Sequence, residues 1–249
     1  MSFSVVIKNL YDSLLDFIYP RTCLICQKKI TADNESQYIK LCCSDCFNSF
    51  EYVDNKKNDK NKLTIRLNEF TSYIANVYSL FSSKSSDDEK NKANIMNLIY
   101  SLKYSGLYKL GPDLGKLLGE VVLENSYMDY DLIIPVPLHN ARLRERGYNQ
   151  SDYIAKGVSK ILDVKVERNV LYRKRNNVSQ TTLTGSKRIE NVKDLFAVRN
   201  SELEKVSGKN ILLIDDVFTT GSTLSQAALA LLENNAYCVN AATIVLREE

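Results

Sequence analysis

One short segment, residues 211–224, combines the residue types most suited to chemistry in this sequence. Its first four residues are apolar and predict a buried strand, and Asp215 and Asp216 follow at the carboxyl end of that strand. The residues after the acidic pair are small and rich in hydroxyls, which is typical of a turn that opens a helix. Because ligands of open α/β sheets bind at this end of the strands, the segment predicts a binding site that contains two carboxylates.

The hydroxyl-rich turn is suited to holding a phosphate. Backbone N–H groups at a helix start and side-chain hydroxyls can donate to phosphate oxygens, and glycine allows the backbone to approach closely. The helix end itself favours an anion by only about 0.3–1 kcal/mol, so hydrogen bonds must provide most of the affinity. The candidate phosphate-binding residues are Thr219, Thr220, Gly221, Ser222 and Thr223. The turn lacks the lysine of a P-loop, which argues against a nucleoside triphosphatase.

Asp215 and Asp216 would repel a phosphate, so we expect them to face another part of the ligand. The hydroxyls of a ribose donate hydrogen bonds to carboxylates, and a Mg²⁺ ion shared with a pyrophosphate accepts carboxylate ligands. Both alternatives make the acidic pair the candidate catalytic residues.

A second candidate region follows an apolar run at 132–136, which predicts another buried strand. That run leads into three loop residues, Val136, Pro137 and Leu138. Arginines then alternate along the chain at Arg142, Arg144 and Arg146. Because alternate residues cannot share one helical face, we expect an extended or looped segment that presents guanidinium groups to an anion; an ordinary solvated basic stretch is the alternative. His139, the only histidine, fits a loop or helix-cap role better than that of a catalytic base.

Five of the six cysteines fall between residues 23 and 46, and two C-x2-C pairs stand sixteen residues apart: Cys23 with Cys26, and Cys43 with Cys46. This spacing is typical of a zinc ribbon, in which four thiolates surround a structural Zn²⁺ and leave no open position. Cys42 is an alternative third ligand with a looser spacing. Because such a cluster favours metal over disulfides in a reducing compartment, we expect the protein in the cytoplasm.

The remaining sequence predicts the elements that position these residues. From residue 73 onward, predicted strands alternate with predicted helices, which indicates an α/β fold with a mostly parallel sheet and helices on both faces. The predicted strands are 73–81, 132–136, one near Val170, 211–214 and 242–246, and the predicted helices are 94–104, 114–122, 151–162 and 224–232. We expect an N-terminal helix and zinc ribbon over 1–52, a linker over 53–72, and the α/β domain over 73–249.

Bulk composition is that of an ordinary globular protein, with 44% apolar residues, 25% charged residues and a net charge of +3. So small a net charge does not by itself indicate a nucleic-acid-binding protein. No run approaches the roughly 18 apolar residues of a membrane span, and the first residues lack the pattern of a signal peptide.

Together these motifs resemble the ComF family of competence-associated proteins. Residues 211–224 are similar to the signature with which type I phosphoribosyltransferases bind 5-phosphoribosyl-1-pyrophosphate (PRPP), and residues 135–150 resemble the central ComF motif. A second ComF motif is similar at Arg173, Arg175, Gln180, Arg188, Asn191 and Val192. The resemblance implies a type I phosphoribosyltransferase fold, with the acidic pair on the ribose hydroxyls, residues 219–223 on the 5′-phosphate and residues 136–138 as a pyrophosphate loop.

The resemblance implies two different activities. The first is a PRPP- and Mg²⁺-dependent glycosyltransferase that releases pyrophosphate, acts on a nucleobase or amine acceptor and closes residues 174–188 over PRPP as a flap. Its candidate pyrophosphate-binding arginines are Arg144, Arg146, Arg173, Arg175 and Arg188. The second is a non-catalytic accessory of natural transformation that binds single-stranded DNA during DNA uptake, contacts the competence machinery and uses PRPP as a ligand. The residues do not identify the acceptor.

Overall fold

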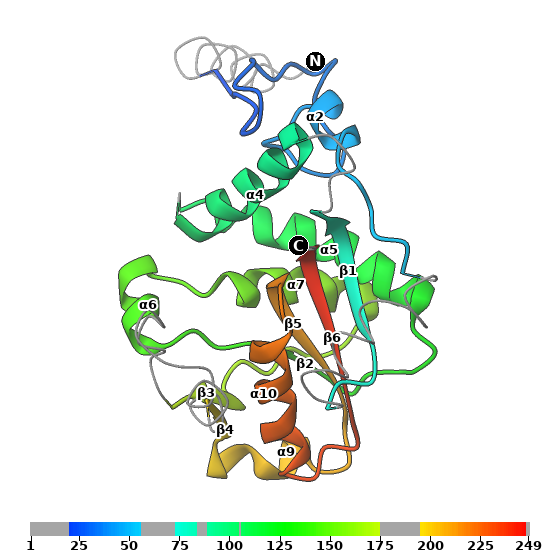
Figure 1. Cartoon of the computed structure of the whole chain (residues 1–249), viewed down its shortest axis with the longest axis vertical. Coiled ribbons are helices and arrows are strands. Elements are labelled where there is room, and N and C mark those ends of the chain that lie inside the picture. The colour runs from blue at the N-terminus through cyan, green and yellow to red at the C-terminus, as the bar shows by residue number, and fades with distance from the viewer. Residues whose placement is uncertain (1–19, 56–72, 84–88, 105, 175–194, 248–249) are drawn as a thin grey trace, which may run out of the picture. The chain divides into compact units, whose positions relative to one another are not determined.

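The computed structural model of the chain describes residues 20–55, 73–83, 89–104, 106–174 and 195–247. The chain divides into two compact units, Met1–Phe50 and Glu51–Glu249, and Figure 1 colours both from the N-terminus to the C-terminus. The smaller unit carries the paired cysteines, and the larger one carries the predicted phosphate site. The predicted linker at 53–72 falls mostly outside the described residues, so its boundaries stay a prediction.

A four-stranded sheet forms the centre of the larger unit (Figure 1). Its strand order is β1-β6-β5-β2, and all three neighbouring pairs are parallel. Almost every residue of the four strands is buried, as expected for a parallel sheet that is covered on both faces. The prediction of a mostly parallel α/β sheet is therefore confirmed. The strands are β1 (Val77–Ser82), β2 (Leu132–Pro135), β5 (Asn210–Phe218) and β6 (Cys238–Leu246).

Helices cover both faces of this sheet. Figure 1 shows α5 and α7 on one face, where they pack against each other, and α10 on the other. Helix α4 precedes α5 along the chain and buries Ile95, Leu98, Ile99 and Leu102. The bounds are α4 (Glu89–Tyr104), α5 (Leu110–Asn125), α7 (Gln150–Leu162) and α10 (Ser222–Leu232).

Smaller elements complete the described part of the chain. Strands β3 (Leu171–Arg173) and β4 (Phe196–Val198) form a separate antiparallel pair. The short helical elements are α2 (Ser44–Asn48), α6 (Asn140–Arg146), η2 (Asn200–Glu202) and α9 (Leu203–Val206). None of the helices in the described ranges is both long and apolar enough to cross a membrane.

Helices α5 and α7 approach each other so closely that only glycine fits at their contact. A Cβ atom added at Gly115 would lie 2.1 Å from the carbonyl oxygen of Ile154, and one added at Gly157 would lie 2.2 Å from that of Pro112. This close packing sets the position of α7 against the sheet, and α7 begins beside the acidic pair.

Two sequence expectations about element bounds are wrong. The strand expected to end at Ile214 continues to Phe218, and Asp215 pairs in register with Thr243 of β6. The acidic residues therefore lie within β5 and not beyond it. The segment with alternating arginines is a helix, α6, where an extended or looped segment was expected.

Candidate phosphate and carboxylate site

Asp215 and Asp216 point to opposite sides of β5, so different neighbours hold them. The Ser151 hydroxyl, in the first turn of α7, donates to Oδ1 of Asp215 at 3.1 Å. The backbone N–H of Asp216 donates to the same oxygen at 2.9 Å. Asp215 therefore receives two hydrogen bonds from uncharged groups.

Asp216 is 4% exposed and has a cationic partner. The Lys103 ammonium group, from the last turn of α4, lies 2.9 Å from Asp216 Oδ2. The Gln150 side-chain amide donates to the same oxygen at 3.0 Å. Sequence analysis did not assign Lys103 or Gln150 to the acidic site, because each is far from the pair in sequence and only the tertiary structure brings them to it.

The two carboxylates make an unequal pair. Burial, followed by the neighbouring charge of Asp216, raises the pKa of Asp215 to about 7. Hydrogen bonds from the Asp216 N–H and Ser151 and the charge of Lys103 oppose this rise without cancelling it. The neutral form of Asp215 is thus accessible near pH 7 in the ligand-free chain.

The hydroxyl-rich turn leads from β5 into α10 as the sequence predicts. Gly221 adopts a left-handed conformation with φ of 76° at the N-cap of α10, and no side chain caps the helix there. Thr219 and Thr220 are exposed, and the Thr220 hydroxyl donates to Ser222 Oγ at 3.2 Å. An uncapped helix start beside exposed hydroxyls provides hydrogen-bond donors for an anion.

The loop after β2 is held next to the acidic strand. The Val136 N–H donates to the Ile214 carbonyl at 2.9 Å, and the Asn149 side chain donates to the Val136 carbonyl at 3.0 Å. The structure thus brings the predicted loop of Val136, Pro137 and Leu138 to the carboxyl edge of the sheet. His139 follows as the N-cap of α6, where its Nδ1 accepts a hydrogen bond from the Ala141 N–H at 3.2 Å.

The arginines of α6 have different environments. Arg146 donates to the Tyr104 hydroxyl at 3.0 Å and to Gln150 Oε1 at 3.1 Å, and its guanidinium lies 4.6 Å from the centre of the Tyr104 ring. Arg146 therefore supports Gln150, the partner of Asp216. Arg144 is exposed on α6.

The arginines of the second motif are described only in part. Arg173 ends β3, and Asp215 is close enough to act on its charge. Arg175, Arg188 and the predicted flap at 174–188, apart from Lys174, lie outside the described residues. Their proposed part in binding pyrophosphate stays a prediction.

The comparisons with known proteins bear on this arrangement. Residues 150–249 match the family model described as "Phosphoribosyl transferase domain". Competence protein F of Haemophilus influenzae is 38% identical over 96 residues, which cover 39% of this chain and 42% of that protein. Competence protein ComFC of Bacillus subtilis is 34% identical over 115 residues, covering 46% of this chain and 44% of that protein. Over the matched region the chain is similar to competence proteins of the ComF family.

A third relative of this chain is the DNA utilization protein YhgH of Escherichia coli O6:H1. It is 35% identical over 146 residues, which cover 57% of this chain and 63% of that protein. The chain thus matches less than two thirds of the length of each of these relatives. Its larger unit has the type I phosphoribosyltransferase fold.

The smaller unit of the chain gathers four thiols that could hold a metal. The Sγ atoms of Cys23, Cys26, Cys43 and Cys46 all lie within 4.8 Å of one another. A tetrahedral zinc ion with Zn–S bonds of about 2.3 Å requires S···S separations of about 3.8 Å. Because the Cys26 and Cys43 sulfurs are 3.8 Å apart, the thiols fit such an ion.

Cys43, and not Cys42, belongs to this group of four. At Cys23, burial acts to raise the pKa of the thiol. The backbone N–H groups of Cys26, Cys43 and Ile25 outweigh burial and lower this pKa to about 6. Burial raises the pKa of Cys42 far above its usual value. The position of its sulfur, outside the group of four, therefore sets Cys42 apart.

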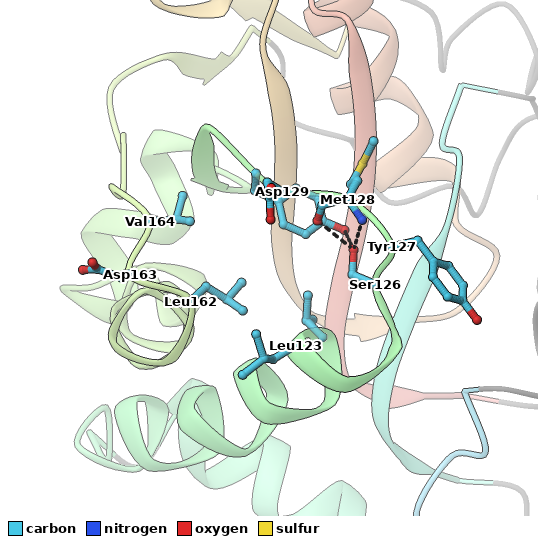
Figure 2. Close-up of a pocket in the computed structure, with 10 residues that line it drawn as sticks. Leu123, Ser126, Tyr127, Met128, Asp129, Leu162, Asp163 and Val164 are labelled. Atoms are coloured by element: carbon cyan, nitrogen blue, oxygen red, sulfur yellow. Dashed lines mark hydrogen bonds between the residues drawn. The ribbon is translucent and has the colours of Figure 1, made fainter.

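One cavity of the larger unit lies away from the acidic pair. It measures about 550 Å³ and is lined by the ends of α5 and α7 and by the loop that precedes β2 (Figure 2). Tyr127, on that loop, is 96% exposed and points away from Leu162 and Val164. The cavity is at the amino edge of the parallel sheet and contains none of the predicted site residues.

Proposed function

We propose that this chain binds PRPP and transfers its phosphoribosyl group to a nitrogen nucleophile with release of pyrophosphate. The observation that carries the proposal is the juxtaposition of two carboxylates in β5 with an uncapped, hydroxyl-rich helix start that follows them. Carboxylates accept hydrogen bonds from ribose hydroxyls, and the helix start donates to a phosphate. Asp215 and Asp216 would therefore hold the ribose, while Thr219–Thr223 would hold the 5′-phosphate.

The acidic pair also fits a Mg²⁺ ion. Within the described ranges, Oδ2 of Asp215 and Oδ1 of Asp216 make no hydrogen bond or ion pair, which leaves one oxygen on each carboxylate. Carboxylate oxygens are ligands that Mg²⁺ prefers. When bound, the ion would offset the negative charge of the pyrophosphate.

In the proposed reaction the bond between ribose C1 and the pyrophosphate oxygen breaks, and pyrophosphate leaves with the electron pair. A bond between C1 and the acceptor nitrogen forms, and that nitrogen loses a proton. The arginines at 144, 146, 175 and 188 would offset the charge of the leaving pyrophosphate beside the loop of residues 136–138, as charged groups placed in advance do in other active sites. A flap at 174–188 would exclude water, which otherwise competes with the acceptor.

The proposal is tested first by calorimetric titration of PRPP in the presence and absence of Mg²⁺. We expect Mg²⁺-assisted binding to the wild-type protein and at least tenfold weaker binding to Asp216→Asn, which loses a charge-assisted contact. Lys103→Met should also weaken binding, because Asp216 loses the cation that offsets its repulsion of PRPP. Lys160→Met, which removes an exposed charge at the other end of α7, is the control.

Turnover is tested separately from binding. Pyrophosphate release is measured with PRPP, Mg²⁺ and a panel of nucleobases, ammonia and amines. Acceptor-dependent release supports the transferase, whereas tight PRPP binding without release across the panel supports the accessory role. Absence of PRPP binding would overturn both.

We further propose that the four paired cysteines hold a structural Zn²⁺, because four thiolates complete a tetrahedron and leave no position for a substrate. Free thiols persist in a reducing compartment, which supports a cytoplasmic location.

A second candidate function is the handling of single-stranded DNA. The relatives carry the names "Competence protein" and "DNA utilization protein". On this chain, Tyr100 and Tyr104 are 61% and 51% exposed, and their ring centres are 4.8 Å apart. Exposed aromatic rings beside the guanidinium of Arg146 form a surface on which bases can stack.

This function is tested by fluorescence anisotropy with an oligo-dT probe at several salt concentrations. Base stacking is worth roughly 1–3 kcal/mol per base, so Tyr100→Ala with Tyr104→Ala should weaken binding at least fivefold. Tyr127→Ala removes a still more exposed ring at the amino edge of the sheet and serves as control. Arg144→Ala should reduce the slope of the logarithm of the binding constant against the logarithm of the salt concentration by about one. Equal effects of the Tyr127 and Tyr100/Tyr104 changes would remove the support for this surface.

A further inference from the structure

A second cavity of the larger unit, which we call the arginine cavity, measures about 330 Å³. Its lining includes three arginines, one tyrosine and two residues of the loop after β2: Arg168, Arg173, Arg199, Tyr172, Pro137 and Leu138. This volume suits a small ring compound.

The charge of this lining is strongly unbalanced. Asp152 is the one acidic residue among the lining residues, against three arginines. Burial raises the pKa of Asp152, although the charge of Arg168 and the hydrogen bond from Asn149 act to lower it. One carboxylate therefore faces three guanidinium groups in this lining.

Among the described residues Arg173 forms no ion pair, although the charge of Asp215 acts on it from farther away. Its Nε is buried and has no hydrogen-bond partner among the described residues. The Phe196 ring lies 5.5 Å from its guanidinium, and Arg142 is near enough to repel it. A buried guanidinium N–H without an acceptor is costly, because a ligand or water must supply the missing bond.

Arg199 is held in a position that leaves its hydrogen-bonding edge available. Its guanidinium lies 5.2 Å from the centre of the Tyr172 ring, and Tyr172 is 36% exposed. A guanidinium stacked on a ring keeps its N–H groups in the plane, where they match the two oxygens of a carboxylate. Within the described ranges no ion pair joins Arg173 or Arg199 to an acidic side chain.

The arginine cavity adjoins the acidic site. Pro137 and Leu138 line it and belong to the loop held against β5, and Arg173 is within electrostatic reach of Asp215. A second substrate placed here would lie beside the ligand of the two carboxylates.

We propose that the arginine cavity binds the acceptor of the phosphoribosyl transfer, and that this acceptor is a small planar compound with a carboxylate group. The inference rests on the proposed function for the identity of the other substrate. Arg173 and Arg199 bind the carboxylate, and Tyr172 flanks the ring.

The main competing occupant is the pyrophosphate of PRPP itself, since guanidinium groups bind either anion. Two pairs of probes are used, each consisting of a carboxylate and its neutral amide: benzoate with benzamide, and nicotinate with nicotinamide. Each is titrated by NMR, following the arginine Nε–H signals, with the protein alone and with the protein saturated with PRPP and Mg²⁺. PRPP binding is measured independently by calorimetry.

We expect each carboxylate to bind at least about tenfold more tightly than its amide, and to bind in the presence of PRPP. Arg199→Gln should abolish this preference, and Lys160→Gln, which removes an exposed charge near the end of α7, should retain it. Circular dichroism checks that both variants fold.

Equal affinities within each pair, or no shift of the arginine signals up to high millimolar concentrations, would overturn the anionic cavity while leaving PRPP binding intact. Loss of carboxylate binding when PRPP is present would assign the arginines to pyrophosphate and overturn the acceptor site. Failure of PRPP to bind would overturn the proposed function and the acceptor role together, even if the carboxylate preference were observed.

Discussion

Adjacent carboxylates with different partners define the site at the scale of the residue. Asp216 has the Lys103 ammonium group at 2.9 Å and the Gln150 amide at 3.0 Å, whereas Asp215 has only the Ser151 hydroxyl and a backbone N–H. Binding a sugar or metal requires both groups to be charged, and the ligand-free chain opposes the second charge. The site thus holds unfavourable electrostatics that a ligand can relieve.

Asp215→Asn should therefore stabilise the ligand-free protein. The pKa of Asp215 is about 7 in the folded chain and about 3.9 when unfolded, so the folded state binds more protons between these values. In the wild-type protein, the contribution of Asp215 to the free energy of unfolding is fully present below pH 4 and is lost as the pH rises towards 7. The variant should gain nothing at pH 4 and roughly 4 kcal/mol at pH 8, which corresponds to about three pKa units at about 1.4 kcal/mol each, measured by urea unfolding in EDTA.

Asp131 serves as a control for that experiment, because its effect on stability should depend on pH in the opposite sense. The Asn210 N–H, followed by the Lys209 side chain, lowers its pKa. Its stabilising effect is therefore present above its ordinary pKa and is lost as the pH falls. Asp131→Asn should destabilise the protein at neutral pH and not at low pH; a gain from Asp215→Asn that does not depend on pH would show that titration is not its cause.

At the scale of elements, the contact between α5 and α7 positions Gln150 and Ser151. A Cβ at Gly157 would lie 2.2 Å from the Pro112 carbonyl oxygen, which belongs to backbone and cannot move aside alone. Helix propensity favours Gly157→Ala by about 1 kcal/mol, and overpacking costs about 1–3 kcal/mol, so overpacking should prevail. We expect a lower free energy of unfolding and weaker PRPP binding. Lys160→Ala is the matched change on an exposed position of α7; a stabilising Gly157→Ala would contradict the close contact.

The elements also show which parts of the molecule sequence reasoning reaches. The apolar run at 211–214 and the turn at 219–223 predict β5 and the start of α10, because burial and turn chemistry are local properties. The local pattern also predicts two elements wrongly. Strand β5 continues through both acidic residues, since pairing with β6 outweighs their charge. The segment with alternating arginines forms α6, because the His139 cap stabilises its first turn. Lys103 reaches Asp216 only through tertiary packing, which no local pattern encodes.

At the scale of the whole molecule, the chain has a small unit with a cluster of four thiols and a large unit with its own core. The smaller unit, Met1–Phe50, buries few large side chains besides Ile30, Ile39, Phe47 and Phe50 among its described residues. A unit of this size rarely folds on apolar burial alone and typically requires metal or disulfides. Its metal affinity would therefore be part of its folding free energy.

The adjacent residues Cys42 and Cys43 provide the test of this division. Cys43→Ala removes one of four clustered sulfurs, so we expect loss of bound zinc and rapid proteolysis of the smaller unit. Cys42→Ala removes a buried sulfur outside the cluster and should keep zinc. Metal content is measured by mass spectrometry, and the thermal transition of the larger unit is followed by calorimetry. That transition should be unchanged in both variants, because the sheet of β1, β6, β5 and β2 lies wholly within Glu51–Glu249. If Cys43→Ala retained zinc and Cys42→Ala lost it, the ligand assignment would be reversed. If the thermal transition of the larger unit were lost along with zinc, the two units would fold as one.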